Sequence, residues 1–316
     1  MNQLSKALRL GIIDTGLISQ DQTAASVINE TLLFASLAES LGYSRYWLTE
    51  HHEPFFAWAS PEIIMPLIAE RTNTIHIGTA GILLYFYSPL KIAEIFRLLE
   101  ALYPGRIDLG VAAGVVADEV GIQALYEGLD FQEAVKKNLY GKKVDTLIDY
   151  LSNNFPKGHR FEQGATPIIQ KIPEVWLLGT GSRNMQLAAT QGTAFSYSIF
   201  HGCSKCDSTI LAKYRDKFKP SKMLTQPRCN VAVAGICAET EVQAKKQQIL
   251  FEKVDQGLTR VNVVGTPEQC NEQIIEIQQK YQVDDIMFLS LWHIFEQRKK
   301  SYEMLSNVFD LSNVLK

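Results

Sequence analysis

Residues 8–48, LRLGIIDTGLISQDQTAASVINETLLFASLAESLGYSRYWL, decide the fold class because they hold a complete strand–helix–strand unit. The apolar run Leu8–Asp14 is typical of a buried strand. Ala25–Leu41 carries apolar residues at helical spacing and ends before Gly42, a common residue just past the last turn of a helix. Tyr46–Leu48 then predicts a second strand. Two apolar strands joined through a helix are typical of a parallel sheet.

The same alternation continues along the chain. Further apolar runs predict strands at residues 75–79, 107–110, 175–178, 194–197, 230–236 and 285–289. Helical patterns occupy residues 61–69, 89–102 and about 131–151, and a final helix is expected after the last strand. In total there are about eight strand–helix units, which favours an α/β fold closed as a (β/α)8 TIM barrel over an open doubly wound sheet.

Two stretches fit no regular unit, and we expect them to be loop insertions. Residues 153–173 are rich in Asn, Pro and Gly, and residues 252–262 contain Gly257 and Arg260. Such segments are often lids or binding loops, with a solvated surface insertion as an equal alternative for each. No linker rich in Pro, Gly or Ser divides the chain, so residues 1–316 are predicted to form a single domain.

Composition narrows the class of protein. A formal charge of −3 offers no basic surface for nucleic acid or an anionic membrane. No apolar run reaches the roughly 20 residues of a spanning helix, and the first residues lack the pattern of a signal peptide. The cysteines therefore indicate reduced thiols rather than a disulfide framework: Cys203, Cys206, Cys229, Cys237 and Cys270. We expect a soluble, cytoplasmic protein.

The residues just after each strand are the first candidates for chemistry, because TIM-barrel active sites lie at the carboxyl ends of the strands. Glu50-His51-His52-Glu53 follows the second strand. Side chains alternate along an extended chain, so only one of the two histidines is expected to face the barrel mouth. That histidine could act as a general acid or base near neutral pH, or could simply be hydrogen-bonded to a neighbouring loop.

A metal site is the rival use of these residues, and the spacing argues against it. The chain has no His-Glu-x-x-His, and its other histidines are scattered: His76, His159, His201 and His293. Cys203 and Cys206 form a single Cys-x-x-Cys with no second pair at zinc spacing, and are interpreted as two loop thiols. We predict no metal.

Small residues follow three further strands. The turn Gly179-Thr180-Gly181-Ser182-Arg183 opens a helix, where backbone N–H groups, hydroxyls and the helix dipole can hold a phosphate, although such turns also simply cap helices. Thr79-Ala80-Gly81 and residues 111–116 are small and uncharged, which permits a flat ring to approach the backbone. The pattern predicts a pocket for a planar, phosphorylated cofactor.

At this point the sequence resembles a known family, the bacterial luciferase-like flavin monooxygenases. Glu50-His51-His52 and Pro104-Gly-Arg-Ile-Asp-Leu-Gly110 are its most specific segments, and the others keep the same order along nearly the whole chain: residues 41–49, 77–84, 88–94, 179–189 and 264–268.

The resemblance implies a (β/α)8 barrel that uses reduced FMN, supplied by a separate flavin reductase, and O2 to oxygenate a small organic substrate. His51 matches the catalytic histidine, and Ala80–Gly81 matches a strained non-proline peptide beside the flavin, with Thr79 next to it. Gly179, Thr180, Gly181, Ser182 and Arg183 fall in the turn that holds the phosphate. Residues 252–262 lie where relatives carry a mobile lid, and a homodimer is plausible from apolar helix faces.

One departure affects the cofactor prediction. Many relatives place an arginine soon after Asp-Leu-Gly, whereas this chain has Ala112-Ala113-Gly114, so Ala113 is expected to line the flavin site without the positive charge. Arg183 or Arg260 would have to compensate, or FMN binds weakly. Two alternatives therefore stay open: hydride transfer with the deazaflavin F420, and a non-catalytic flavin-binding barrel subunit.

Overall fold

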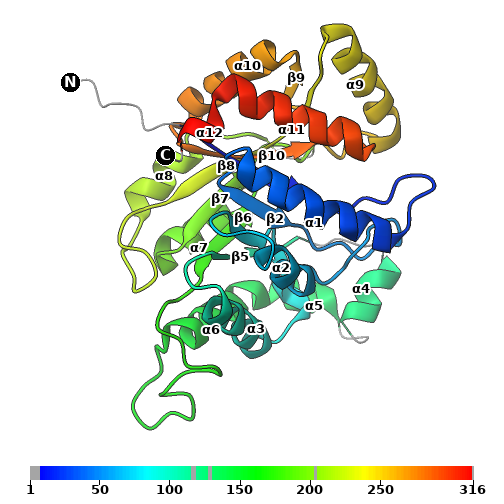
Figure 1. Ribbon diagram of the computed structural model, residues 1–316. Helices are drawn as coiled ribbons and strands as arrows, with labels where there is room; N and C mark the ends of the chain where they lie inside the picture. Colours follow the sequence, from blue (N-terminus) through cyan, green and yellow to red (C-terminus); the bar gives the residue numbers. More distant parts are fainter. Residues whose placement is uncertain (1–7, 115–118, 127–129, 203–204, 315–316) are drawn as a thin grey trace.

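The computed structural model describes residues 8–114, 119–126, 130–202 and 205–314. Strands and helices alternate through this part of the chain and surround a central barrel (Figure 1). The strands are β1 Arg9–Asp14, β2 Arg45–Leu48, β3 His76–Thr79, β4 Ile82–Leu83, β5 Ile107–Ala112, β6 Glu174–Gly179, β7 Ala194–Ser198, β8 Cys229–Cys237, β9 Val263–Gly265 and β10 Asp285–Ser290. The helices are α1 Ala24–Ser40, α2 Pro61–Ala69, η1 Leu84–Phe86 (a short 3₁₀ turn), α3 Pro89–Leu102, α4 Glu119–Leu125, α5 Phe131–Lys136, α6 Leu139–Ser152, α7 Ser182–Gln191, α8 Ile210–Lys217, α9 Glu241–Asp255, α10 Pro267–Tyr281, α11 Phe295–Phe309 and α12 Leu311–Val314.

The strands close into a ring. Hydrogen-bonded neighbours run β10-β1-β2-β3-β5-β6-β7-β8, and β8 pairs with β10 to complete the circle. Every pair is parallel, which requires a crossover between successive strands, and the two short strands β4 and β9 add to β5 and β8 outside the ring. The predicted eight-stranded TIM barrel is confirmed.

The barrel has two apolar layers because its strands are buried on both faces. Inward side chains from several strands form one cluster, with Trp47 and Trp176 in edge-to-face contact at 5.2 Å. The larger cluster lies between the strands and the surrounding helices. Gly11 leaves room inside the barrel, since a Cβ there would lie 2.4 Å from the sulfur of Met287.

A buried ion cluster holds the amino ends of the strands. Arg45 donates to Asp108 and, at 3.3 Å, to Asp285, while Trp47 donates to Asp108 at 2.8 Å. Burial alone would raise the pKa of Asp108, but Arg45 and His76 outweigh burial and lower it. The Pro104–Gly110 segment is thus structural: it supplies this carboxylate at the end of the barrel opposite the mouth.

Two predicted segments differ from the structure. The expected helix at 131–151 is broken after Lys136, because Asn138 adopts a left-handed conformation with φ of +51°, and so becomes α5 and α6. The irregular stretch predicted at 252–262 starts later, since α9 continues to Asp255.

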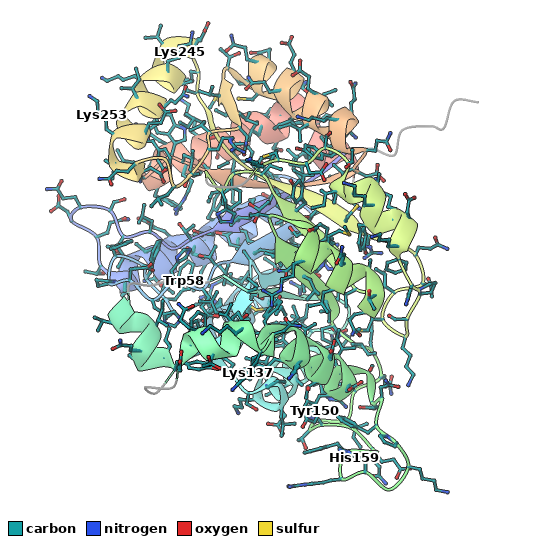
Figure 2. The ribbon with its side chains drawn as sticks, turned by 180° about the vertical axis from the view of Figure 1, so that it is seen from behind. Trp58, Lys137, Tyr150, His159, Lys245 and Lys253 are labelled. Carbon is teal, nitrogen blue, oxygen red and sulfur yellow. The ribbon has the colours of Figure 1, made fainter. Side chains whose placement is uncertain are left out.

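Residues 153–173 contain no helix or strand, as expected. Figure 1 shows this segment as the green loop between α6 and β6 that extends away from the barrel. Figure 2 places Tyr150 and His159 at this end of the molecule, whereas Lys245 and Lys253 lie on α9 at the opposite end.

The described cysteines Cys206, Cys229, Cys237 and Cys270 are free thiols, as predicted, while Cys203 of the Cys-x-x-Cys lies outside the described residues. Within the described ranges, no helix combines the length and apolarity needed to cross a membrane.

Candidate active site

A large cavity of about 900 Å³ opens at the carboxyl ends of the barrel strands. This volume is at the upper end of the range for small-molecule and cofactor sites. Segments that follow β2, β3, β5, β6, β7 and β10 all contribute to its wall. The predicted site residues that line it are His51, Ala80, Gly81, Ala113, Gly179, Thr180, Gly181, Ser182 and Arg183.

The two adjacent histidines have different surroundings. His51 lines the cavity, whereas His52 does not and its Nε2 lies 2.9 Å from Oε1 of Glu50. Glu50 is buried and also accepts hydrogen bonds from the Leu83 amide at 3.0 Å and the Tyr87 hydroxyl at 2.8 Å. His52 therefore belongs to a hydrogen-bonded network centred on Glu50, and only His51 of the two histidines lines the cavity, so the expected divergence of the two side chains is observed.

The environment of His51 favours a neutral imidazole. Burial lowers its pKa below the ordinary 6.5, and the nearby Glu53 carboxylate partly opposes this effect. Nδ1 of His51 lies 3.6 Å from Oε2 of Glu53, too far for a hydrogen bond, and both atoms are buried without a hydrogen-bond partner. The ring stacks on Phe56 with centroids 4.2 Å apart. A neutral ring near a carboxylate can accept a proton from a group in the cavity.

Ala80 and Gly81, which follow β3, form the part of the cavity surface that we call the floor, and it has no bulky side chains. Gly81 has φ of +117°, which other residues rarely adopt, and a Cβ would lie 2.6 Å from the Cβ of Ala112. The Ala80–Gly81 peptide is trans, so the unusual backbone geometry resides in the φ of Gly81 rather than in the peptide bond.

Thr79, predicted as a cofactor-binding residue, is fully buried and is not among the residues that line the cavity. Its hydroxyl donates to the Gly110 carbonyl at 2.9 Å and accepts from the Gly110 amide at 3.0 Å. Thr79 therefore joins β3 to β5 and supports the floor from outside.

The turn after β6 presents an open helix terminus. Gly181 precedes α7 in an extended conformation, and no side chain caps the helix. The first-turn N–H groups are therefore available to an anion, with the positive end of the helix dipole behind them. A Cβ on Gly181 would meet no atom within 4 Å, so the approach is open.

The arginines that line the cavity are not all the ones that the sequence predicted. Arg183 lines the cavity beside the turn and donates to Asn138. Arg260 is not part of the cavity wall; its guanidinium donates to the carbonyls of Ile199 at 3.2 Å and Gly202 at 3.4 Å. Arg260 thus joins the loop after β7 to residues 255–262, and of the two arginines considered as compensation only Arg183 lines the cavity. Arg298, which the sequence analysis did not single out, is buried and lines the cavity.

Two histidines treated as scattered in the sequence also reach the cavity. His201 follows β7 and His293 follows β10, and burial lowers the pKa of each. The strand-end rule that selected His51 would have found both. Buried hydroxyls without hydrogen-bond partners also face this space, and they are Thr49, Ser198 and Ser290. Such orphaned groups are expected where a polar ligand supplies the missing partner.

Residues 255–259 form part of the cavity wall above the barrel mouth. Asp255, Leu258 and Thr259 line the cavity, and Thr259 forms an antiparallel bridge with His201. The Gly202 amide donates to the Leu258 carbonyl at 2.7 Å. This segment lies within the region expected to be a lid and rests on the loop after β7.

Comparison with known proteins gives consistent similarities. A family model described as luciferase-like monooxygenase matches residues 8–251. A luciferase-like monooxygenase of Escherichia coli (strain K12) is 31% identical over 90% of this chain and 84% of that protein. An N-acetyl-S-alkylcysteine monooxygenase of Bacillus subtilis (strain 168) is 27% identical over 95% of this chain and 98% of that protein. The solved structure of apo-MsnO8 superimposes with a TM-score of 0.84 at 26% identity, covering 97% of this chain and 99% of that one.

Proposed function

Because the chain belongs to the luciferase-like monooxygenase family, we propose that it uses reduced FMN and O2 to oxygenate a small organic substrate in specialised metabolism. The observation that carries the proposal is the single cavity that brings His51, the Ala80–Gly81 floor and the uncapped start of α7 together. Reduced flavin supplies the electrons that activate O2.

The residues present fit a phosphorylated flavin. The first turn of α7 and Arg183 would hold the phosphate, and the orphaned hydroxyls of Ser198 and Ser290 offer polar partners deeper in the cavity. The Ala80–Gly81 floor would support the flat ring, because no side chain projects from Gly81. Ala113 adds no positive charge beside the phosphate turn. We therefore propose that FMN binds weakly and exchanges with a separate flavin reductase.

His51 is proposed as the catalytic residue. Its lowered pKa keeps the imidazole neutral at pH 7, so Nε2 or Nδ1 can accept a proton from a reacting group in the cavity. Glu53 would stabilise the imidazolium that forms. The walls of the cavity, closed in part by residues 255–259, would limit the access of water during the reaction.

We also propose a cytoplasmic homodimer. The four described cysteines are free thiols, which suits a reducing compartment. Large apolar side chains are exposed on neighbouring helices α1, α2 and α3, and they are Leu33, Ile63, Leu67, Leu98 and Leu102. A second copy covering these helices would remove this surface from water. Light scattering of the purified chain at micromolar concentration measures the mass; a monomer there contradicts the proposal.

The function is tested with the purified chain and reduced cofactors. We expect reduced FMN to bind and its complex to be oxidised by O2 more slowly than free reduced FMN, with ¹⁸O from ¹⁸O2 entering a product. Small thioethers are the first substrates to try, because a relative is named for N-acetyl-S-alkylcysteine. Anaerobic oxidation of reduced F420 by an organic acceptor would replace the proposal with hydride transfer. Failure of both cofactors to bind at high micromolar concentration would favour a non-catalytic subunit.

A further inference from the structure

Arg298 is a buried cation in the wall of the cavity. It lies at the end of the first turn of α11, the helix that follows the last barrel strand, and only 9% of the residue is exposed. Long cationic side chains are almost never this buried unless they are paired. The partners of its guanidinium therefore need to be accounted for.

The guanidinium makes no hydrogen bond within the described residues. Its nearest carboxylate oxygen is Oδ1 of Asp14, 3.8 Å from a terminal nitrogen and beyond hydrogen-bond distance. The Nε atom of Arg298 is buried without any hydrogen-bond partner. The guanidinium also faces the ring of Phe295 at 5.6 Å, which supplies no acceptor oxygen.

Asp14 is already satisfied by other groups. Its Oδ1 accepts from the Gly16 amide at 3.0 Å, and its Oδ2 accepts from the hydroxyls of Thr31, at 3.0 Å, and Tyr46. The carboxylate thus balances the charge of Arg298 at a distance but does not engage its donors. Burial is the largest single effect and disfavours the charged guanidinium, but Asp14 together with Tyr46, Tyr302 and Glu30 outweighs it and raises the pKa of Arg298, so the side chain stays cationic.

Arg298 and the proposed phosphate turn, residues 179–183, lie at separate positions around the barrel. It follows β10, whereas the turn follows β6, and β7 and β8 separate these strands on the shorter side of the ring. Ser290 ends β10 in the same cavity wall and has an unpartnered hydroxyl. The Ser290 amide donates to Tyr302, which lies one helical turn from Arg298 on α11.

We infer that Arg298 binds a carboxylate of the organic substrate, so that the enzyme acts on small organic acids. A planar carboxylate can accept two parallel hydrogen bonds from a guanidinium. A carboxylate in the cavity would therefore supply the acceptors that Arg298 lacks among the described residues. Ser290 offers a further hydroxyl to the same group. This inference rests on the proposed function, because it assigns the substrate class of that site.

The test compares acids with their uncharged amides by calorimetric titration, with and without oxidised FMN. The probes are hexanoate, benzoate and N-acetyl-S-methylcysteine, each with the matching primary amide. We expect at least one acid to bind about tenfold or more tightly than its amide, the effect of one charge-assisted contact. Arg298→Gln should abolish this preference. Arg298→Lys keeps a cation beside Asp14 and should weaken the preference, and it serves as the test if the glutamine variant fails to fold.

The control is Lys299→Gln, which removes one neighbouring positive charge from α11 and should retain the preference for acids. The inference is overturned if no acid binds better than its amide, or if the preference survives in both Arg298 variants. It is also overturned if the Arg298 variants weaken binding of FMN but not of riboflavin, since Arg298 would then contact the flavin phosphate. Failure of FMN to bind, with the acid preference intact, would refute the proposed function alone.

Discussion

Restoring the missing arginine at position 113 is the sharpest test of the cofactor site. Ala112 pairs in register with Leu178, so Ala113 lies beside Gly179 at the start of the proposed phosphate turn. Ala113 is half-buried and lines the cavity. In Ala113→Arg the new side chain would therefore reach the open first turn of α7 without crossing the barrel.

The magnitude follows from two opposing contributions. A hydrogen bond to a charged group contributes about 1.5–3 kcal/mol. Ordering a long arginine that stays partly exposed costs roughly 1 kcal/mol, which leaves about 1–2 kcal/mol for one hydrogen bond in the middle or upper part of that range. Affinity for FMN should then rise about five- to thirtyfold. Riboflavin, which has the same ring system and no phosphate, should gain nothing.

Fluorescence titration of oxidised FMN and riboflavin into the wild-type chain and each variant measures the change. Ala113→Gln is the matched control, because it adds comparable bulk without charge and should leave both affinities near the wild-type values. An equal gain for FMN and riboflavin would refute the reasoning, and so would an unchanged FMN affinity in a folded Ala113→Arg protein. Either outcome would place the phosphate away from the turn at Gly179.

Four further substitutions test the wall of the cavity, its surface after β3 and the adjacent His52. His51→Ala should lower turnover by about a hundredfold or more, which is the usual contribution of a general base. His52→Ala should lower turnover by less. Equal effects of the two substitutions in steady-state assays would contradict the assignment of His51 as the base. Because the pKa of His51 lies below 6.5 and the neutral form is required, activity should fall only as the pH drops below that value. Glu53→Gln removes the group that raises this pKa, so the acid limb of the rate profile should move to lower pH, and an upward shift would contradict the role of Glu53. Gly81→Ala introduces a Cβ 2.6 Å from that of Ala112 at a φ of +117°. The free energy of unfolding measured in urea should therefore fall by about 2–4 kcal/mol. An unchanged urea midpoint would mean that the loop adapts to the added methyl group.

Much of the fold was readable from local patterns. The strand in residues 8–14 and the helix ending before Gly42 appear within one residue of their expected positions. Periodic burial and turn residues are local properties, so sequence order alone reports them. The break at Asn138 was missed because a single left-handed residue leaves the apolar pattern around it unchanged.

The candidate site was predicted only where a rule linked sequence position to the barrel mouth. The rule that chemistry follows strand ends selected His51 and the turn at Gly179, and the cavity includes both. The same rule admitted Thr79, which the fold instead uses to join β3 to β5. Arg298 was overlooked because it lies on a helix and carries no motif.

The sequence by itself determined a parallel eight-stranded barrel, its order of elements and the family resemblance, because these depend on apolar periodicity and on short contiguous motifs. Only the tertiary structure decided which charged groups share one cavity. His51, His201 and His293 follow strands that are far apart in the sequence, Arg298 lines the same cavity, and Arg260 instead donates a hydrogen bond to the loop after β7. Ring closure brings these side chains together, burial then lowers the pKa of the three histidines, and Nε of Arg298 is left without a hydrogen-bond partner among the described residues.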